Sequence, residues 1–328
     1  MAHAPLVSIV TPSYNQALYL EKTIRSVLNQ DYENLEYLIV DGGSTDGSIE
    51  IIRKYEHRLS WWVSEKDSGQ ADGINKGLKQ AKGEIVAWIN SDDLYFPGAV
   101  SVMVDAFNQT PDMGFIYGDV LSIDGQGKVF NLMTFVPYHL EDLMSFNIIS
   151  QPGVFIKRDI LEKTDYLDMS LNFLFDIQLW LKLSQYASFR YVPGITAAAR
   201  YHPMAKNVQA GRGFGMEAYM IIDWMRAQPV LAQKMEGIIR RVWSGAHRIN
   251  ARYLLDGGMP ALAFKAYIKS LVAYPPIAIN EWHRMLYSLL CLLGLNRVKN
   301  AFYSFREKPH RNEYNIYETK MADFLASE

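Results

Sequence analysis

The sequence predicts an α/β protein: a parallel sheet wrapped by helices, with a helical extension at the C-terminal end. Three observations lead to this fold class. Short apolar runs alternate with segments of helical periodicity through the first 125 residues, as in a sheet wrapped by helices. Glycine-rich segments follow the apolar runs, where such sheets bind their ligands. After residue 229 the strand signals stop, and helical segments alternate with Gly and Pro breakers.

The first 125 residues contain five predicted strands and two well-marked helices. The strands are expected at residues 6–11, 35–41, 60–64, 84–90 and 114–120. One helix has an apolar face formed by Leu20, Ile24, Val27 and Leu28. The other has an apolar face formed by Val100, Met103, Val104 and Phe107, with Pro97 in its first turn. These elements are expected to form one half of a larger domain.

The remaining chain is expected to complete that domain and then add a helical region. Short strands are predicted at 153–156 and 189–192, and a helix near 172–187. The predicted division is therefore a domain of residues 1–228, whose two halves are 1–125 and 126–228, followed by a helical region of residues 229–328.

Composition limits the class of protein. The 328 residues, 49% of them hydrophobic, can bury a sizeable core, which excludes disorder as the main state. A net charge of −2 argues against a general nucleic-acid binder. The charge is uneven, because residues 1–130 have an excess of eight acidic side chains and residues 229–328 an excess of six basic ones. A single cysteine and the lack of a signal peptide predict a cytoplasmic protein.

Two adjacent carboxylates, Asp92 and Asp93, follow the predicted strand that contains Trp88. At the carboxyl end of a strand they would place negative charge in the ligand crevice. Hard oxygen ligands of this kind suit Mg²⁺ or Mn²⁺ bound to a diphosphate. The alternative is a solvated turn in which an Asp caps the next helix, and the sequence leaves both interpretations open.

Polar loops also follow the first two predicted strands. The run Thr11-Pro12-Ser13-Tyr14-Asn15 ends the first strand, and a run of small polar residues that begins with Asp41 ends the second. Such groups suit a nucleotide base and ribose, whereas ordinary loop chemistry is the alternative. Neither a GxGxxG fingerprint nor a GxxxxGK[ST] loop is present, so the sequence supports neither a dinucleotide-binding protein nor a P-loop protein.

Three later segments carry further candidate residues. Residues 64–77 form a polar loop followed by the start of a predicted helix, whose first amides could face a phosphate. Lys76 could instead be only a solvated helix residue. Asp176 lies in a helix that is apolar nearly all round, so it either lines a site or is a structural Asp bonded to a loop. Arg200, His202 and Lys206 could bind a phosphate or complete a metal shell, or could be packed side chains.

In this order, the blocks resemble glycosyltransferase family 2, the nucleotide-sugar transferases with a GT-A fold, over about residues 6–225. The resemblance implies a Rossmann-like mixed sheet flanked by helices. The resemblance assigns residues 1–125 to the nucleotide-sugar and residues 126–228 to the acceptor. It implies that the donor is held by Thr11, Tyr14, Asp41 and Asp92, and by a loop motif matched at Asp67, Gly69, Asp72, Asn75, Lys76 and Gly77.

The same resemblance implies a metal site and a catalytic base. The metal is expected chiefly on Asp93, with Asp92 and His202 as further ligands, and Asn90 replaces the first acid of the family's metal motif. Asp176 matches the family's catalytic base. Phe175 and Gln178 replace the acidic neighbours of that base, which affects the expected orientation of the base and its acceptor contacts.

The implied reaction is an inverting transfer in which Asp176 activates an acceptor hydroxyl against the anomeric carbon of a UDP-, GDP- or dTDP-sugar, with Mn²⁺ or Mg²⁺. The acceptor would be a glycan or lipid-linked glycan in cell-surface polysaccharide or glycolipid synthesis. The alternative is a catalytically inactive nucleotide-sugar-binding scaffold, which Asn90 and Phe175 favour. A sugar-phosphate nucleotidyltransferase would need a Gly-rich opening loop that is missing after Thr11.

Cations and aromatic residues surround the apolar stretch Met285–Leu295 in the C-terminal region. This stretch is about half of the roughly 20 residues that a spanning helix needs, so no transmembrane helix is predicted. A helix lying in an anionic membrane interface fits the pattern and would make the protein peripheral on the inner face of the membrane. The alternative is a helical bundle packed on the catalytic domain with a solvated basic face.

Overall fold

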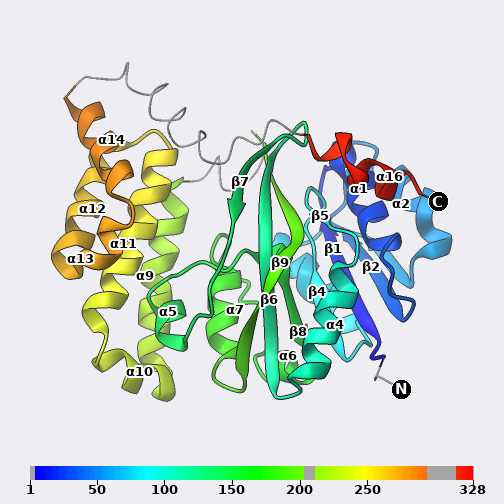
Figure 1. The fold of residues 1–328 in the computed structure, drawn as a ribbon, viewed down its shortest axis with the longest axis horizontal. Coiled ribbons are helices and arrows are strands. Elements are labelled where there is room, and N and C mark those ends of the chain that lie inside the picture. Colours follow the sequence, from blue (N-terminus) through cyan, green and yellow to red (C-terminus); the bar gives the residue numbers. More distant parts are fainter. Residues whose placement is uncertain (1–3, 203–210, 294–314, 328) are drawn as a thin grey trace.

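A nine-stranded sheet crosses the molecule, with helices against both of its faces and a group of helices at one end (Figure 1). The computed structural model describes residues 4–202, 211–293 and 315–327. The strands are β1 (Val7–Ser13), β2 (Leu35–Asp41), β3 (Trp61–Ser64), β4 (Ile85–Trp88), β5 (Leu94–Tyr95), β6 (Met113–Asp124), β7 (Val129–Met133), β8 (Val154–Lys157) and β9 (Ser188–Tyr201).

The sheet is mixed, as predicted. Strands β3, β2, β1 and β4 lie side by side and parallel. Strand β8 then runs antiparallel to β4, and β6 runs antiparallel to β8. Strand β9 lies parallel to β6, and the short β5 pairs antiparallel with β9 at the edge. Strand β7 pairs with β6 outside this order.

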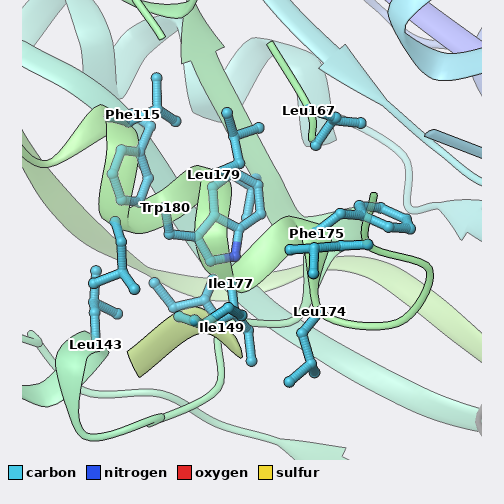
Figure 2. Close-up of a cluster of buried hydrophobic side chains, with 14 of the residues drawn as sticks. Phe115, Leu143, Ile149, Leu167, Leu174, Phe175, Ile177, Leu179 and Trp180 are labelled. Carbon is cyan, nitrogen blue, oxygen red and sulfur yellow. The ribbon is translucent and has the colours of Figure 1, made fainter. Parts of the chain in front are cut away.

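Both faces of the parallel strands are apolar because successive side chains point to opposite faces. On one face, Ile9 and Ile39 share a core with α1, α2 and α4. On the other, Val10 and Leu38 share a core with α3 and α7, part of which is seen around Trp180 in Figure 2. The helices of this part are α1 (Ala17–Leu28), α2 (Ser48–Tyr55), α3 (Gln70–Gln80), α4 (Ala99–Gln109), α5 (Leu140–Met144), α6 (Arg158–Glu162) and α7 (Phe175–Leu183), with 3-10 turns η1 (Glu56–Arg58) and η2 (Gln151–Gly153).

The helical group shares its core with the sheet domain. Phe214, Ile221 and Ile249 belong to the same buried cluster as Trp180 of α7. Because the helical group includes α9, it begins ahead of the predicted boundary at residue 228. Its helices are α9 (Gly211–Ala227), α10 (Pro229–Glu236), α11 (Ile239–Asp256), α12 (Pro260–Ala273), α13 (Pro275–Ile279) and α14 (Trp282–Leu292). Within the described ranges, none of the helices combines the length and apolarity that crossing a membrane requires.

The end of the chain returns to the part of the sheet domain formed by residues 1–125, where η4 (Ile316–Glu318) and α16 (Lys320–Ala326) lie near α1 (Figure 1). Ile316, Met321 and Leu325 bury their side chains in a cluster with Leu94 and Ile123. The predicted region of residues 229–328 is therefore not one appendage, because its last part packs against the opposite side of the sheet domain.

Most of the predicted elements are confirmed, with ends shifted by a few residues, and three details differ. The sequence does not predict strands β5 and β7. Strand β9 is much longer than 189–192, because it pairs along most of β6 across several register shifts. Pro97 precedes α4 rather than lying in its first turn, since the helix starts at Ala99 after Gly98, whose φ is +76°.

Candidate active site

The carboxyl ends of the parallel strands form one polar edge of the sheet. In the register of the sheet, Ser13 at the end of β1 lies opposite Asp41 at the end of β2, and Asp41 lies opposite Ser64 at the end of β3. Ligands of open α/β sheets bind at this edge. The pairing therefore brings together three of the loops that the sequence predicts for nucleotide binding.

Hydrogen bonds join the loop after β1 to the loop after β2. The Asn15 amide donates to Ser44 Oγ at 2.8 Å, and the Asn15 side chain accepts from the Thr45 amide at 2.9 Å. Asp46 Oδ2 accepts from the Ala17 amide at 2.9 Å, which satisfies a donor at the start of α1. The two loops thus form one connected unit.

The three residues predicted to hold the nucleotide differ sharply in exposure. Asp41 is fully buried, and its carboxylate accepts from the amides of Gly43 and Ser44 and from the hydroxyls of Ser44 and Ser64. Thr11 is also fully buried, with its hydroxyl 2.9 Å from the Tyr37 hydroxyl. Tyr14, by contrast, is 61% exposed. Of these three side chains, Tyr14 faces solvent, whereas Asp41 and Thr11 are buried and hydrogen-bonded to residues of neighbouring strands.

The loop after β3 lies against the loop after β2 through Asp67. A Cβ on Gly42 would lie 2.6 Å from Asp67 Oδ2, and one on Gly73 would lie 3.2 Å from it. Asp67 Oδ1 also accepts from the Gly69 amide at 3.0 Å, and Gly69 has a φ of +119°, which other residues rarely adopt. The glycines therefore make room for the Asp67 carboxylate at this edge.

The other motif residues of this segment stabilise α3 and its neighbours. Asp72 accepts from the Ser68 amide ahead of the helix, and Lys76 pairs with Glu65 at 2.9 Å. Asn75 is buried and makes two hydrogen bonds with the backbone of Leu167. A contact of Asn75, Asp72 or Lys76 with a donor stays a prediction.

The pairing of β5 with β9 brings Asp92 and His202 together. Leu94 lies opposite Ala198 in this pair, so the turn before β5 meets the end of β9. His202 Nε2 lies 3.0 Å from Asp92 Oδ2. The Tyr19 ring packs on the His202 ring with 4.8 Å between centroids. One carboxylate and one imidazole thus face each other beside α1.

Asp93 is placed differently from Asp92. It is only 5% exposed, Oδ1 accepts from the Arg200 amide at 2.8 Å, and Oδ2 accepts from the Asn90 side chain at 3.0 Å. Burial, followed by the neighbouring Asp92 carboxylate, raises the pKa of Asp93 well above its ordinary value. Each oxygen of Asp93 thus accepts one hydrogen bond from the protein, and its role as the chief metal ligand stays a prediction.

Asp92 and His202 fit a divalent cation that is also held by its substrate. Mg²⁺ sites commonly use one or two protein carboxylates together with phosphate oxygens, and imidazole is a ligand that softer divalent ions accept. In the described ranges, no three His, Cys, Asp or Glu side chains gather closely enough to form a complete metal site. The donor set therefore suits a metal whose remaining ligands come from a diphosphate.

Asp176 lies in the first turn of α7, at the rim of a buried helix. Its neighbours Phe175 and Ile177 are buried in the apolar cluster of Figure 2, while Asp176 itself is half-buried. Burial, opposed by hydrogen bonds from backbone amides and assisted by Glu217, raises the pKa of Asp176 to about 7. A carboxyl group with this pKa is suited to act as a general base near neutral pH.

One ring contact and one electrostatic interaction relate α7 to the strands that carry the metal candidates. Trp180 stacks on Trp88 of β4 with 5.7 Å between ring centroids, and Asp92 follows Trp88 by one short turn. Tyr253 of α11 lies near both Tyr201 and Asp176, whose charges add to burial in raising its pKa. Tyr253 thus links the start of α7 to the end of β9, where His202 follows Tyr201.

The residues that replace acids beside Asp176 are both buried. Phe175 is 7% exposed and packs in the apolar core. Gln178 is 2% exposed and donates to Asp168 at 3.2 Å. A second carboxylate next to Asp176 would thus have to be buried, and the apolar Phe175 avoids that cost.

Sequence reasoning missed Glu217, Tyr253 and Tyr317, which lie far along the chain from the motifs. Tyr317 accepts a hydrogen bond of 2.6 Å from Arg200, whose Nε donates to the Asp92 carbonyl. One signal for Glu217 was available, because it shares a helix face with the apolar Phe214 and Ile221. Lys206 lies outside the described residues.

A surface hollow lined by Glu84, Asn108 and Lys157 lies at the start of β4. It is at the opposite end of this strand from the turn that contains Asp92 and Asp93.

Comparisons with known sequences identify a matching family and several relatives. The model of "Glycosyl transferase family 2" matches residues 8–163. An uncharacterized glycosyltransferase of Rickettsia typhi is 28% identical, covering 61% of this chain and 65% of its own. Chondroitin synthase of Escherichia coli is 29% identical, covering 58% and 28%. The putative teichuronic acid biosynthesis glycosyltransferase TuaG of Bacillus subtilis is 32% identical, covering 55% and 72%. The chain spans less than two thirds of the length of the first two relatives.

Solved structures share the fold over most of the chain. S. aureus TarS 1-349 in complex with UDP-GlcNAc has a TM-score of 0.58 and 18% identity, covering 84% of this chain and 91% of its own. Mannosyltransferase PcManGT from Pyrobaculum calidifontis, in complex with GDP-Man and Mn²⁺, has a TM-score of 0.54 and 20% identity, covering 88% and 86%. These likenesses confirm the predicted GT-A fold.

Proposed function

The chain belongs to glycosyltransferase family 2, and from this premise we propose that it transfers a sugar from a nucleotide-sugar to an acceptor hydroxyl with inversion at the anomeric carbon. The observation that carries the proposal is Asp176, a half-buried carboxyl group at the start of α7 whose pKa is raised to about 7. Trp180 of the same helix stacks on Trp88, the last residue of β4.

In the proposed mechanism, ionised Asp176 accepts the proton of the acceptor hydroxyl. The oxygen then forms a bond to the anomeric carbon, while the bond from that carbon to the diphosphate oxygen breaks and the nucleoside diphosphate leaves with the electron pair. A single displacement of this kind inverts the anomeric centre. General-base assistance commonly contributes about 10²- to 10⁴-fold in rate.

We propose Asp92 and His202 as the residues that hold the metal, with Asp93 as a buried support of the same turn. Their 3.0 Å approach and the hydrogen bonds of Asp93 support this assignment. A bound Mn²⁺ or Mg²⁺ would supply positive charge that stabilises the departing diphosphate. Arg200 supports the turn, because its guanidinium donates to the carbonyls of Asp92 and Asp124.

For the donor, the proposal is a nucleoside diphosphate hexose such as a UDP-, GDP- or dTDP-sugar. UDP-GlcNAc and GDP-Man bound to the proteins of similar fold support this class. For the acceptor, the proposal is a growing glycan or lipid-linked glycan of the cell envelope. The names of the teichuronic acid and chondroitin relatives support a polysaccharide pathway.

We also propose a cytoplasmic location with peripheral attachment to an anionic membrane surface. The support is that apolar residues and lysines of the helices α12 and α14 are exposed: Val272 of α12 is 72% and Trp282 of α14 is 56% exposed, and Lys265 and Lys269 of α12 are exposed too. Several arginines of this region do not add to the surface charge, because they bind other groups of the protein. Arg252 pairs with Glu281, Arg284 pairs with Asp256, and Arg248 donates to the Phe146 carbonyl. Flotation with anionic vesicles tests the attachment, and protein that stays at the bottom at low salt contradicts it.

A donor screen tests the proposed function. UDP-, GDP- and dTDP-sugars are added with Mn²⁺, and the melting temperature of the full chain is measured, because a ligand that binds only the native state raises it. Each stabilising donor is then assayed for release of nucleoside diphosphate with and without glycan acceptors. Turnover supports the transferase. Stabilisation without any release of nucleoside diphosphate supports the inactive nucleotide-sugar-binding scaffold instead.

A further inference from the structure

Glu217 of α9 binds the segment of chain from which α7 starts. It is 5% exposed, and its carboxylate accepts from three consecutive backbone amides: Asn172 at 2.7 Å, Phe173 at 2.8 Å and Leu174 at 2.8 Å. Backbone donors ahead of a helix need partners from outside that helix. Leu174, the N-cap of α7, has no side-chain acceptor of its own. Glu217, a side chain from another helix, supplies the acceptor for the amides of the segment that leads into α7.

The same face of α9 also holds the Phe173 side chain. The Phe214 and Phe173 rings pack with 4.8 Å between centroids. A Cβ on Gly213 would lie 2.0 Å from a Phe173 ring atom, so glycine is needed for this close approach. Residues 172–174 are thus held through both backbone and side chain by α9.

We propose that Glu217 is a positioning residue for Asp176, acting through the three amides it binds and through its charge. The proposal rests on the proposed role of Asp176 as base. Asp176 follows the bound segment by two residues, so a shift in residues 172–174 moves the start of α7 and the carboxyl group with it. Misplacement of a reacting group by about 1 Å can cost roughly 100-fold in rate.

The charge of Glu217 has a separate effect that can be measured. The charge of Glu217 on α9 acts on Asp176, and the charge of Asp176 in turn acts on Tyr253 of α11. After burial, the Glu217 carboxylate raises the pKa of Asp176, because it disfavours a second negative charge nearby. Removing that charge should lower the pKa of Asp176, so the acid side of the kcat profile should move to lower pH.

The test compares Glu217→Gln with Asp223→Asn, which makes the same charge change at an exposed site on α9. For Glu217→Gln we expect kcat to fall about 10- to 100-fold, the donor KM to stay within about twofold, and the acid limb of kcat to move to lower pH. Asp223→Asn should match the wild type. A wild-type kcat and pH profile in folded Glu217→Gln overturns the proposal, even if its melting temperature falls.

Glu217→Asp keeps the proposal testable if Glu217→Gln does not fold. This variant retains the charge but shortens the side chain, so kcat should fall while the acid limb stays near that of the wild type. A wild-type kcat in Glu217→Asp contradicts the positioning role. Asp176→Asn separates the two proposals. Full activity of Asp176→Asn contradicts the role of Asp176 as the base. Loss of activity in Asp176→Asn together with wild-type activity of the Glu217 variants contradicts only the role of Glu217.

Discussion

At the scale of single residues, the Asp176 carboxyl group should set the acid side of the pH profile. A general base acts in its ionised form, and burial raises the pKa of this group to about 7. We therefore predict that kcat rises with pH up to about 7 and falls roughly tenfold per pH unit well below it. A profile of kcat from pH 5 to 9 checks this. A kcat that stays flat down to pH 5 would mean that the titrating base is another group.

Substitution of Asp92 is expected to lower donor affinity, whereas substitution of Asp93 is expected to lower stability. Removing a group that hydrogen-bonds a metal ligand typically lowers metal affinity about 10- to 100-fold, and removing the ligand itself should cost at least as much. Asp92→Asn should therefore lose most of the donor affinity gained with Mn²⁺. Asp93→Ala should instead lower the free energy of unfolding by about 1–3 kcal/mol, because it leaves the Arg200 amide without its buried acceptor.

Calorimetry with and without Mn²⁺, together with urea unfolding, separates these outcomes. Asp105→Asn, an exposed change on α4, is the control and should affect neither measurement. If Asp93→Ala kept normal stability and lost the effect of Mn²⁺, the metal would have to be reassigned to Asp93.

The sequence identified the residue types of the site better than their roles. Asp41 and Asn75 stood out as polar groups in predicted loops and helix starts, yet both are buried and bonded to the protein. Residue type and spacing cannot show this, because the partners Ser64 and Leu167 come from other segments. Asp176 was more predictable, since a carboxyl group inside an apolar helix is costly unless it serves a purpose.

At the scale of elements, the packing of α3 on β1 depends on Gly77. A Cβ at this position would lie 2.3 Å from Val10 Cγ1. Gly77→Ala should therefore reduce the free energy of unfolding by about 1–3 kcal/mol, as overpacking of a core does. Urea unfolding measures the change, with the exposed Gln80→Ala on the same helix as control, expected within about 0.5 kcal/mol of the wild type. Wild-type stability of the Gly77→Ala variant would show that α3 can move away from β1.

The parallel strands were predictable because both of their faces are buried, which gives continuous apolar runs. β5 has only two residues, too few for any periodic signal, and it owes its form to pairing with β9. The length of β9 was not predictable either. Its register shifts against β6 around Gly118 and Asp119 interrupt the alternation by which a strand is recognised.

At the scale of the whole molecule, a buried charge network joins α11, α12 and α14. Glu281 accepts from the Tyr267 hydroxyl at 2.8 Å and pairs with Arg252. Burial acts to raise the pKa of Glu281, but Arg252, Arg248 and Arg284 outweigh it and lower the pKa to about 2. The stability from this ionised group is complete above its ordinary pKa of 4.5 and is lost as the pH falls toward 2.

Glu281→Gln should therefore destabilise the protein by about 3–5 kcal/mol at pH 7, because it leaves buried arginines uncompensated. It should also flatten the dependence of stability on pH between 4.5 and 2. Thermal unfolding across this range, compared with the exposed Asp223→Asn, measures both effects. Unchanged stability at pH 7 would contradict the network.

The overall charge pattern could be counted from the sequence but not located. The basic excess of residues 229–328 suggested a cationic surface, whereas Arg248 and Arg284 are buried. Nor could the sequence predict that Tyr317 reaches Arg200, because a contact across 117 positions leaves no local pattern. Contacts of this kind decide which charges remain on the surface.

The most direct test of the central claim is Asp176→Asn, assayed with a donor identified in the screen. Donor affinity with Mn²⁺ and the rate of nucleoside diphosphate release in the presence of acceptor are measured on the same preparation. We predict a donor dissociation constant within about twofold of the wild type and a rate lower by about 10²-fold or more. Wild-type turnover by folded Asp176→Asn would contradict Asp176 as the base on which the proposed transfer depends.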